Sequence, residues 1–127
     1  MKLRWEIYTK AGKHGSAFVV AEGLTRLLPD EPQPFIWRAH SQRHMEGGSV
    51  HRAIEMLLAI VNRFTDEPTF PFNLACYNSQ VGNLDQAKAW LHIAFEVAEK
   101  NGTGLRWKSL AMDEPDLAPM RKQFGGI

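Results

Sequence analysis

The feature that most constrains the fold is a self-similarity of the chain at a spacing of 34 residues. In residues 73–91, apolar and small residues recur three and four positions apart on both sides of Gly82. That spacing predicts two amphipathic helices joined by a tight turn. The shift brings four pairs of like residues together: Gly48 with Gly82, Ala53 with Ala87, Leu57 with Leu91 and Pro34 with Pro68. Because the hairpin recurs, the sequence predicts an all-α fold of stacked helical hairpins.

The length of this unit and its packing residues resemble the tetratricopeptide repeat (TPR) family, whose helix-turn-helix unit has about 34 residues. The third copy is the most similar, with Leu74, Ala75, Gly82, Ala87, Leu91 and Ala94 at the family's packing positions. The second copy has Trp37, Gly48, Ala53 and Leu57 at the matching places. The first and most degenerate copy has Ile7, Tyr8, Ala11, Gly15, Val20, Leu24, Leu27 and Pro32.

The resemblance implies a small bacterial-type TPR protein with three helical hairpins stacked into a right-handed α-solenoid. Its repeats are expected at about residues 1–33, 34–67 and 68–101, within a single domain of residues 1–127. Helices at about 104–124 would cap the last repeat, because a repeat cannot bury both its faces alone. The expected covering side chains are Leu105, Trp107, Leu110, Leu117 and Met120.

Serines and prolines suggest where individual helices begin and end. Ser16 and Ser49 are predicted N-caps, because a serine hydroxyl accepts from the free amides of a first turn. The proline-rich segment 29–34 is expected to separate two helices, with Trp37 opening the second of them. Residues 65–71 are predicted to be a second proline-bearing connector, and Asp116 is predicted to cap a C-terminal helix.

Composition places few limits on the partner. A chain of 127 residues with a net charge of +1 and no block of like charges gives no reason to expect a nucleic acid or an anionic membrane. No signal peptide and no membrane-spanning segment is expected. The single Cys76 cannot form an internal disulfide, which is compatible with a reducing compartment. These features favour a cytoplasmic protein.

The resemblance also implies a partner-binding surface on the concave side, where the first helix of each repeat exposes its side chains. Arg38 offers a planar fork to a carboxylate, and Asn73 stands where family members often hold a peptide backbone. Thr69 and Phe72 replace the basic residues of the carboxylate-clamping members. The expected lining is Lys2, Trp5, Thr9, Lys13, Arg38, Gln42, Met45, Phe72, Asn73, Cys76, Ser79 and Gln80.

These observations favour a non-enzymatic protein-protein interaction module that binds a peptide or a helix of a partner in its concave groove. One alternative is a chaperone or assembly factor for a secreted or membrane-complex subunit. A homo-oligomer is a further possibility, because an exposed apolar groove can pair with a copy of itself. The residues indicate no cofactor, since the glycines lack the spacing of a phosphate-binding loop.

Histidines provide a second alternative, a metal-binding protein. His40 and His44 lie one helical turn apart and could share a metal ion, with His51 as a third ligand. Both also fall at positions that the repeat normally buries, so the sequence favours packing histidines and no metal. Cys76 is small enough to be a packing residue rather than a nucleophile. The acidic residues Asp113, Glu114 and Asp116 are expected to cap helices rather than to catalyse proton transfer.

Overall fold

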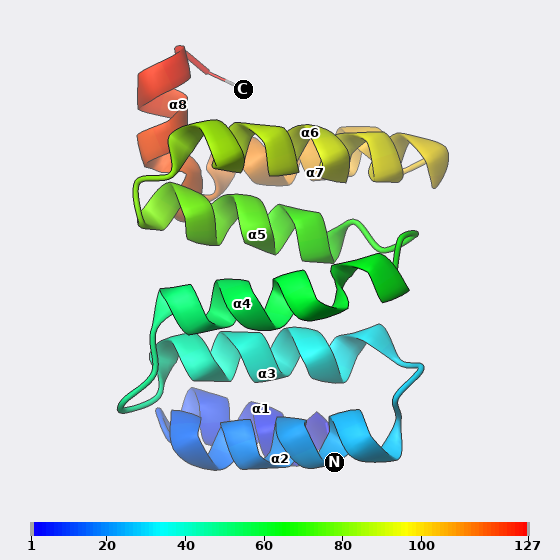
Figure 1. The fold of residues 1–127 in the computed structure, drawn as a ribbon, viewed down its shortest axis with the longest axis vertical. Coiled ribbons are helices and arrows are strands. Elements are labelled where there is room, and N and C mark those ends of the chain that lie inside the picture. Colours follow the sequence, from blue (N-terminus) through cyan, green and yellow to red (C-terminus); the bar gives the residue numbers. More distant parts are fainter. Residues whose placement is uncertain (1, 127) are drawn as a thin grey trace. The chain divides into compact units, whose positions relative to one another are not determined.

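The structure of the chain is a computed structural model that describes residues 2–126. These residues form eight α-helices and two short 3-10 helices and include no β-strand, which confirms the all-α prediction (Figure 1). The helices gather into two compact units, with the boundary between Ile60 and Val61. This boundary falls within the second predicted repeat, residues 34–67. The single-domain arrangement stays a prediction.

Unit 1 consists of four helices: α1 (Lys2–Lys10), α2 (His14–Leu27), α3 (Pro32–His44) and α4 (Val50–Ile60). α1 packs against α2, α2 against α3, and α3 against α4. Small residues, among them Ala17, Ala21, Ala39 and Ala53, are fully buried and let helix backbones approach closely. Leu24 is the largest apolar side chain buried on α2. α1 contributes no buried residue.

Unit 2 holds four further helices and two short 3-10 helices. Their bounds are Val61–Arg63 (3-10), α5 (Thr69–Gln80), α6 (Leu84–Lys100), α7 (Gly104–Asp113), Pro115–Leu117 (3-10) and α8 (Ala118–Phe124). α5 packs on α6 and α6 on α7, while the second 3-10 helix and α8 return to α5. The largest apolar side chains that are fully buried in this unit are Phe70, Leu74, Leu91, Leu117 and Met120.

α7 and α8 lie where the sequence predicts capping helices, but only part of the predicted covering face is buried. Leu117 and Met120 are buried, whereas Leu105 and Leu110 are 85% and 46% exposed, so the prediction for these two leucines is wrong. The inward stripe of α7 instead contains Gly104 and Ala111, which are buried, and Trp107. Positions 104, 107 and 111 are three and four apart and therefore share one helix face; 105 and 110 lie off it.

Two hairpins, α1–α2 and α5–α6, have the same turn. Gly82 adopts a left-handed conformation with φ +86°, which a side chain would strain. Its N–H donates to the Ser79 carbonyl, and the Asn83 N–H donates to the Asn78 carbonyl at 2.9 Å. These two bonds form a Schellman motif, which satisfies the last carbonyls of the helix. The turn after α1 has the same pair of bonds, from the residues at 12 and 13 to the carbonyls of 9 and 8.

The turn between α3 and α4 is different, and here the predicted equivalence of Gly48 with Gly82 is wrong. The left-handed residue is Gly47, with φ +76°, and one additional residue follows it before α4. The addition restores the alignment of Ala53 with Ala87, and both are fully buried. Gly48 is needed for another reason: a Cβ atom there would overlap the main-chain oxygen of Gln42.

Proline positions account for two errors in the predicted helix boundaries. α3 begins at Pro32, so Trp37 lies inside this helix rather than at its start. α5 begins at Thr69 and contains Pro71 in its first turn. The missing N–H of a proline costs nothing in a first turn, where the amides have no intrahelical partner. The prolines therefore lie within the beginnings of helices as well as between them.

The two serines predicted to be N-caps have different outcomes. The Arg52 N–H donates to Ser49 Oγ at 3.1 Å, which confirms Ser49 as the cap of α4. α2 begins at His14 and has no side-chain cap, so the prediction for Ser16 is wrong. Ser16 lies inside the first turn of α2, because the Schellman turn at Gly12 starts that helix earlier than the serine suggests.

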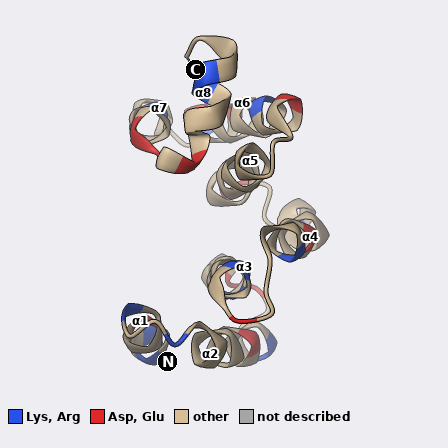
Figure 2. Cartoon of the chain, turned by 90° about the vertical axis from the view of Figure 1, so that its left-hand side faces the viewer, with Lys and Arg blue, Asp and Glu red and all other residues tan. Residues whose placement is uncertain are grey.

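Charged residues are distributed unevenly over unit 1. α1 has three basic residues, Lys2, Arg4 and Lys10, and one acidic residue, Glu6. Figure 2 shows this basic helix beside α2. Among residues 2–126, no helix is both long enough and apolar enough to cross a membrane.

Candidate functional site

A pair of stacked tryptophans connects α1 and α3, which correspond to the first helices of the first two predicted repeats. The rings of Trp5 on α1 and Trp37 on α3 stack with their centroids 5.2 Å apart and their planes inclined by 20°. Trp5 Nε1 donates at 2.9 Å to the hydroxyl of Ser41, which is fully buried. Both rings are only half-buried. The bond and the stack therefore hold large aromatic surfaces in place while part of each stays open to solvent.

A hollow of about 320 Å³ adjoins Trp37, and we call it the tryptophan hollow. Its size is near the lower limit of small-ligand pockets. The lining combines four apolar residues with three polar ones: Leu24, Leu28, Pro34 and Trp37, and Lys2, Glu31 and Gln33. Apolar walls beside a few polar groups suit the side chain of a bound peptide.

The residues predicted to line a partner surface on or just after α1 and α3 differ in exposure. Lys2 and Lys13 are exposed, Trp5, Thr9, Arg38 and Met45 are half-buried, and Gln42 is buried. Among the described residues, three of this set hold a buried polar atom with no hydrogen-bond partner: Thr9 Oγ1, Arg38 Nε and Gln42 Oε1. An unpaired buried polar group is costly. This face of unit 1 thus has unused hydrogen-bonding capacity.

The predicted lining residues on α5 are mostly packed in the interior. Phe72, Cys76 and Ser79 are buried, Asn73 is half-buried and Gln80 is exposed. The Phe72 and Trp107 rings form an edge-to-face contact with their centroids 5.1 Å apart. Gln80 Nε2 donates to Asp116 Oδ1 at 2.7 Å. These contacts use the side chains of Phe72 and Gln80 within the unit, and the burial of Cys76 agrees with its predicted packing role.

Histidines of α2 and α3 form a cluster that the sequence predicts only in part. The His40 and His44 ring centroids are 4.7 Å apart, as expected for one helical turn. His14 at the start of α2 lies 5.2 Å from His44 and 6.5 Å from His40. His51 is exposed on α4 and makes none of these ring contacts. The third member is therefore His14, which the sequence pattern does not reveal, because a helix capped by Ser16 would leave His14 outside it, whereas α2 begins at His14.

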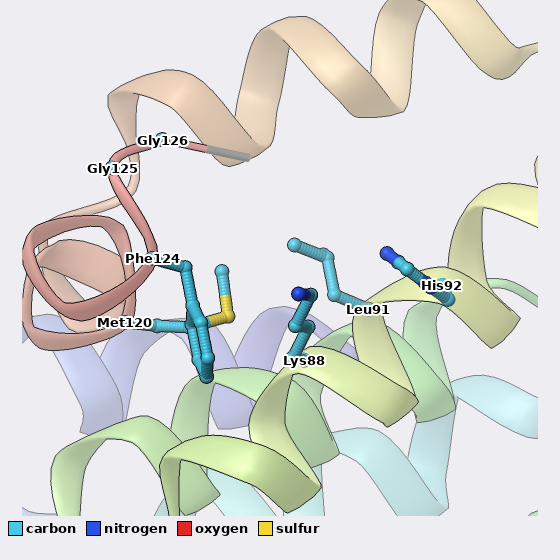
Figure 3. A pocket seen from close by; sticks show the side chains of 7 residues that line it. All are labelled: Lys88, Leu91, His92, Met120, Phe124, Gly125 and Gly126. Carbon is cyan, nitrogen blue, oxygen red and sulfur yellow. The ribbon is translucent and has the colours of Figure 1, made fainter.

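A further pocket, absent from the sequence predictions, lies between α6 and α8 and has a volume of about 300 Å³. Figure 3 shows Lys88, Leu91 and His92 projecting from α6, with Met120 and Phe124 facing them from α8. The Lys88 ammonium lies 4.5 Å from the centre of the Phe124 ring, a cation-π contact. Leu91 and Met120 are almost fully buried. No local motif marks this pocket, because it depends on the return of α8 to α6.

The acidic residues after α7 have structural roles. Glu114 Oε1 accepts from the Asp116 N–H at 3.2 Å and so caps the 3-10 helix Pro115–Leu117. The cap is therefore Glu114 and not Asp116, whose carboxylate accepts from Gln80. The prediction of a capping role holds for this segment, with the residue corrected.

Comparison of the chain with protein-family models, with curated proteins and with solved structures gave no match. The candidate site therefore depends on the geometry of these residues alone.

Proposed function

We propose that the chain is a non-enzymatic protein-interaction module of the TPR type, a scaffold whose first helices bind a peptide or a helix of a partner protein. The observation that carries the proposal is the tryptophan hollow beside the Trp5–Trp37 stack. Tryptophan and arginine are enriched among the residues that dominate binding energies. In unit 1, half-buried tryptophans and Arg38 lie on the two helices that the repeat pattern assigns to the binding side.

The charge of α1 suggests the chemistry of the partner segment. Lys2 lines the tryptophan hollow, and Arg4 and Lys10 lie on the same helix. Opposite charge across an interface speeds association and rejects wrong partners. The segment that suits this surface has an apolar side chain for the hollow and a carboxylate next to it. Arg38 Nε, which is buried without a partner, could be satisfied by a polar group of that segment once the guanidinium turns outward.

Location in the cytoplasm remains part of this proposal. It is supported by the single Cys76, which is buried on α5 and would be chemically compatible with a reducing compartment.

The proposal is tested by selecting binders from a phage-displayed random peptide library on the full chain and measuring their affinity by fluorescence polarisation. Leu28→Arg places a charge in the tryptophan hollow. Leu110→Arg is the matched control, because both leucines are 46% exposed and Leu110 lies on α7, outside the hollow. We expect Leu28→Arg to weaken the selected peptides by about tenfold or more and Leu110→Arg to leave their affinity unchanged.

Arg38→Glu reverses the charge next to the stack and is expected to weaken acidic peptides most, with circular dichroism showing an intact helix content. If no peptide is enriched, this surface is not the binding site. The same conclusion follows if Leu28→Arg and Arg38→Glu both bind the selected peptides as tightly as the wild type does.

A further inference from the structure

The pocket between α6 and α8, which we call the α6–α8 pocket, lies wholly within unit 2. The tryptophan hollow, by contrast, is formed by unit 1 alone. The floor of the α6–α8 pocket is apolar, because Leu91 and Met120 are each 1% exposed and the half-buried Phe124 lines it beside them. Its volume of about 300 Å³ is near the lower limit of small-ligand pockets. A compact ligand with an apolar body therefore suits this space.

The polar side chains that line the α6–α8 pocket are both basic and both come from α6. Lys88 and His92 are four residues apart, so they share one helix face with their Cβ atoms about 5–6 Å from each other. Figure 3 shows these two side chains on the same side of α6 as Leu91, facing the turn at Gly125 and Gly126. Both are exposed, and no Asp or Glu of residues 2–126 lines the pocket. The charge of the lining thus favours an anion.

Lys88 and His92 can both donate hydrogen bonds to that anion. The Lys88 ammonium lies 4.5 Å from the centre of the Phe124 ring. The face of the ring attracts the charge and positions the ammonium, while the N–H groups that point away from the ring can still donate. His92 supplies a second donor, because an imidazole has at least one N–H in either protonation state. Two donors one helical turn apart match the two oxygens of a carboxylate.

We propose that the α6–α8 pocket binds a small aromatic monocarboxylate whose ring lies on Leu91, Met120 and Phe124. Its carboxylate accepts hydrogen bonds from Lys88 and His92. An aromatic body suits this floor, because a thioether sulfur and a second ring both make favourable contacts with an aromatic ring. A phosphate suits it less, because a doubly charged group beside apolar walls loses more hydration than one lysine restores.

The test is a titration of the full chain with phenylacetate, followed in two-dimensional ¹H–¹⁵N NMR spectra, which give both the affinity and the amides that respond. We expect saturable shifts concentrated in α6 and α8. Phenylacetamide has the same ring without the charge, and acetate has the charge without the ring. Each is expected to bind at least about tenfold more weakly than phenylacetate, because each lacks one half of the recognition.

Lys88→Met removes the ammonium and keeps a side chain of similar length, and the exposure of Lys88 lets the variant retain the fold. We expect it to bind phenylacetate about tenfold more weakly and phenylacetamide as the wild type does. Lys100→Met is the matched control, because Lys100 is also an exposed lysine of α6 but does not line the pocket. This variant should bind phenylacetate with unchanged affinity.

Leu28→Arg distinguishes the α6–α8 pocket from the tryptophan hollow, which also has apolar walls and a lysine. We expect Leu28→Arg to bind phenylacetate as tightly as the wild type does. The inference is overturned if phenylacetate causes no saturable shifts at millimolar concentration, or if phenylacetamide binds as tightly. It is also overturned if Lys88→Met and Lys100→Met weaken binding equally. Loss of binding with Leu28→Arg but not with Lys88→Met would assign the carboxylate to the tryptophan hollow instead.

Discussion

α1 and α5 are each the first helix of a hairpin, and each ends in a Schellman turn. The two helices are nevertheless held in place very differently. None of the residues of α1 is buried, whereas nine residues of α5 are. α1 is anchored through the half-buried Trp5, while α5 packs on α6, on α8 and on the 3-10 helix before α8. The shared turn therefore determines local geometry, whereas burial determines how much each helix contributes to stability.

The largest expected effect on stability comes from the buried helix α5. Phe70 on α5 is fully buried and stacks on Phe64 with centroids 5.3 Å apart. Phe70→Ala removes that ring and leaves a cavity, so we expect a loss of roughly 3–5 kcal/mol in the free energy of unfolding. Ile7→Ala on α1 is the control, because Ile7 is 57% exposed and its truncation should cost less than about 0.5 kcal/mol.

Chemical denaturation gives the free energies of unfolding of the two variants. Hydrogen exchange of Phe70→Ala should show the loss of protection in the amides of unit 2. Equal costs for Phe70→Ala and Ile7→Ala would contradict the difference in burial on which the comparison rests.

The sequence predicts most of what makes the hairpins. Helical spacing of small and large residues identifies Ala53, Ala87 and Leu91, which are buried with almost no exposure. Local patterns do so because a helix that packs on one side repeats its apolar face every three to four residues. The turn at Gly82 is predictable for a similar reason, since a left-handed residue needs a glycine.

The remaining features depend on contacts that a local pattern does not contain. The need for glycine at position 48 comes from its close approach to the carbonyl of Gln42, where a Cβ atom would not fit. Cys76 and Ser79 are predicted to line the groove, but both are buried on α5. A local pattern does not show how many other elements pack around a helix. His14 joins the cluster only because α2 returns along α3.

The next effect tests how α1 is attached. Trp5→Phe keeps an aromatic ring for the stack on Trp37 but removes the N–H that donates to the buried Ser41 hydroxyl. We expect a loss of roughly 1–3 kcal/mol, because Ser41 is left without this partner in the interior. Trp90→Phe is the control: Trp90 is also half-buried. Hydrogen exchange of α1 should accelerate in the Trp5 variant alone, and unchanged exchange would mean that the stack suffices to hold the helix.

A smaller effect concerns the turn that the two hairpins share. Gly82→Ala forces a side chain into the left-handed region and should cost roughly 1–2 kcal/mol. Gly12→Ala, with φ +74° at the same place in the first hairpin, should impose the same local strain. Gly23→Ala is the control, because this glycine lies within α2 with open space around its Cβ position. This variant should raise the free energy of unfolding by about 0.5–1 kcal/mol. Thermal unfolding of the three variants checks the order.

The smallest expected effect on stability concerns the N-cap of α4, which follows the turn that is not a Schellman turn. α2 and α6 follow Schellman turns and have no side-chain cap, whereas α4 follows the longer Gly47–Gly48 turn and is capped by Ser49. Ser49→Ala should cost about 1 kcal/mol, because the Arg52 amide loses its acceptor. Ser16→Ala, in the first turn of α2, should change the free energy of unfolding by less than about 0.5 kcal/mol. If Ser16→Ala lowered the free energy of unfolding as much as Ser49→Ala, the Ser16 side chain would also stabilise the start of α2. The Schellman turn alone would then not be enough to start that helix.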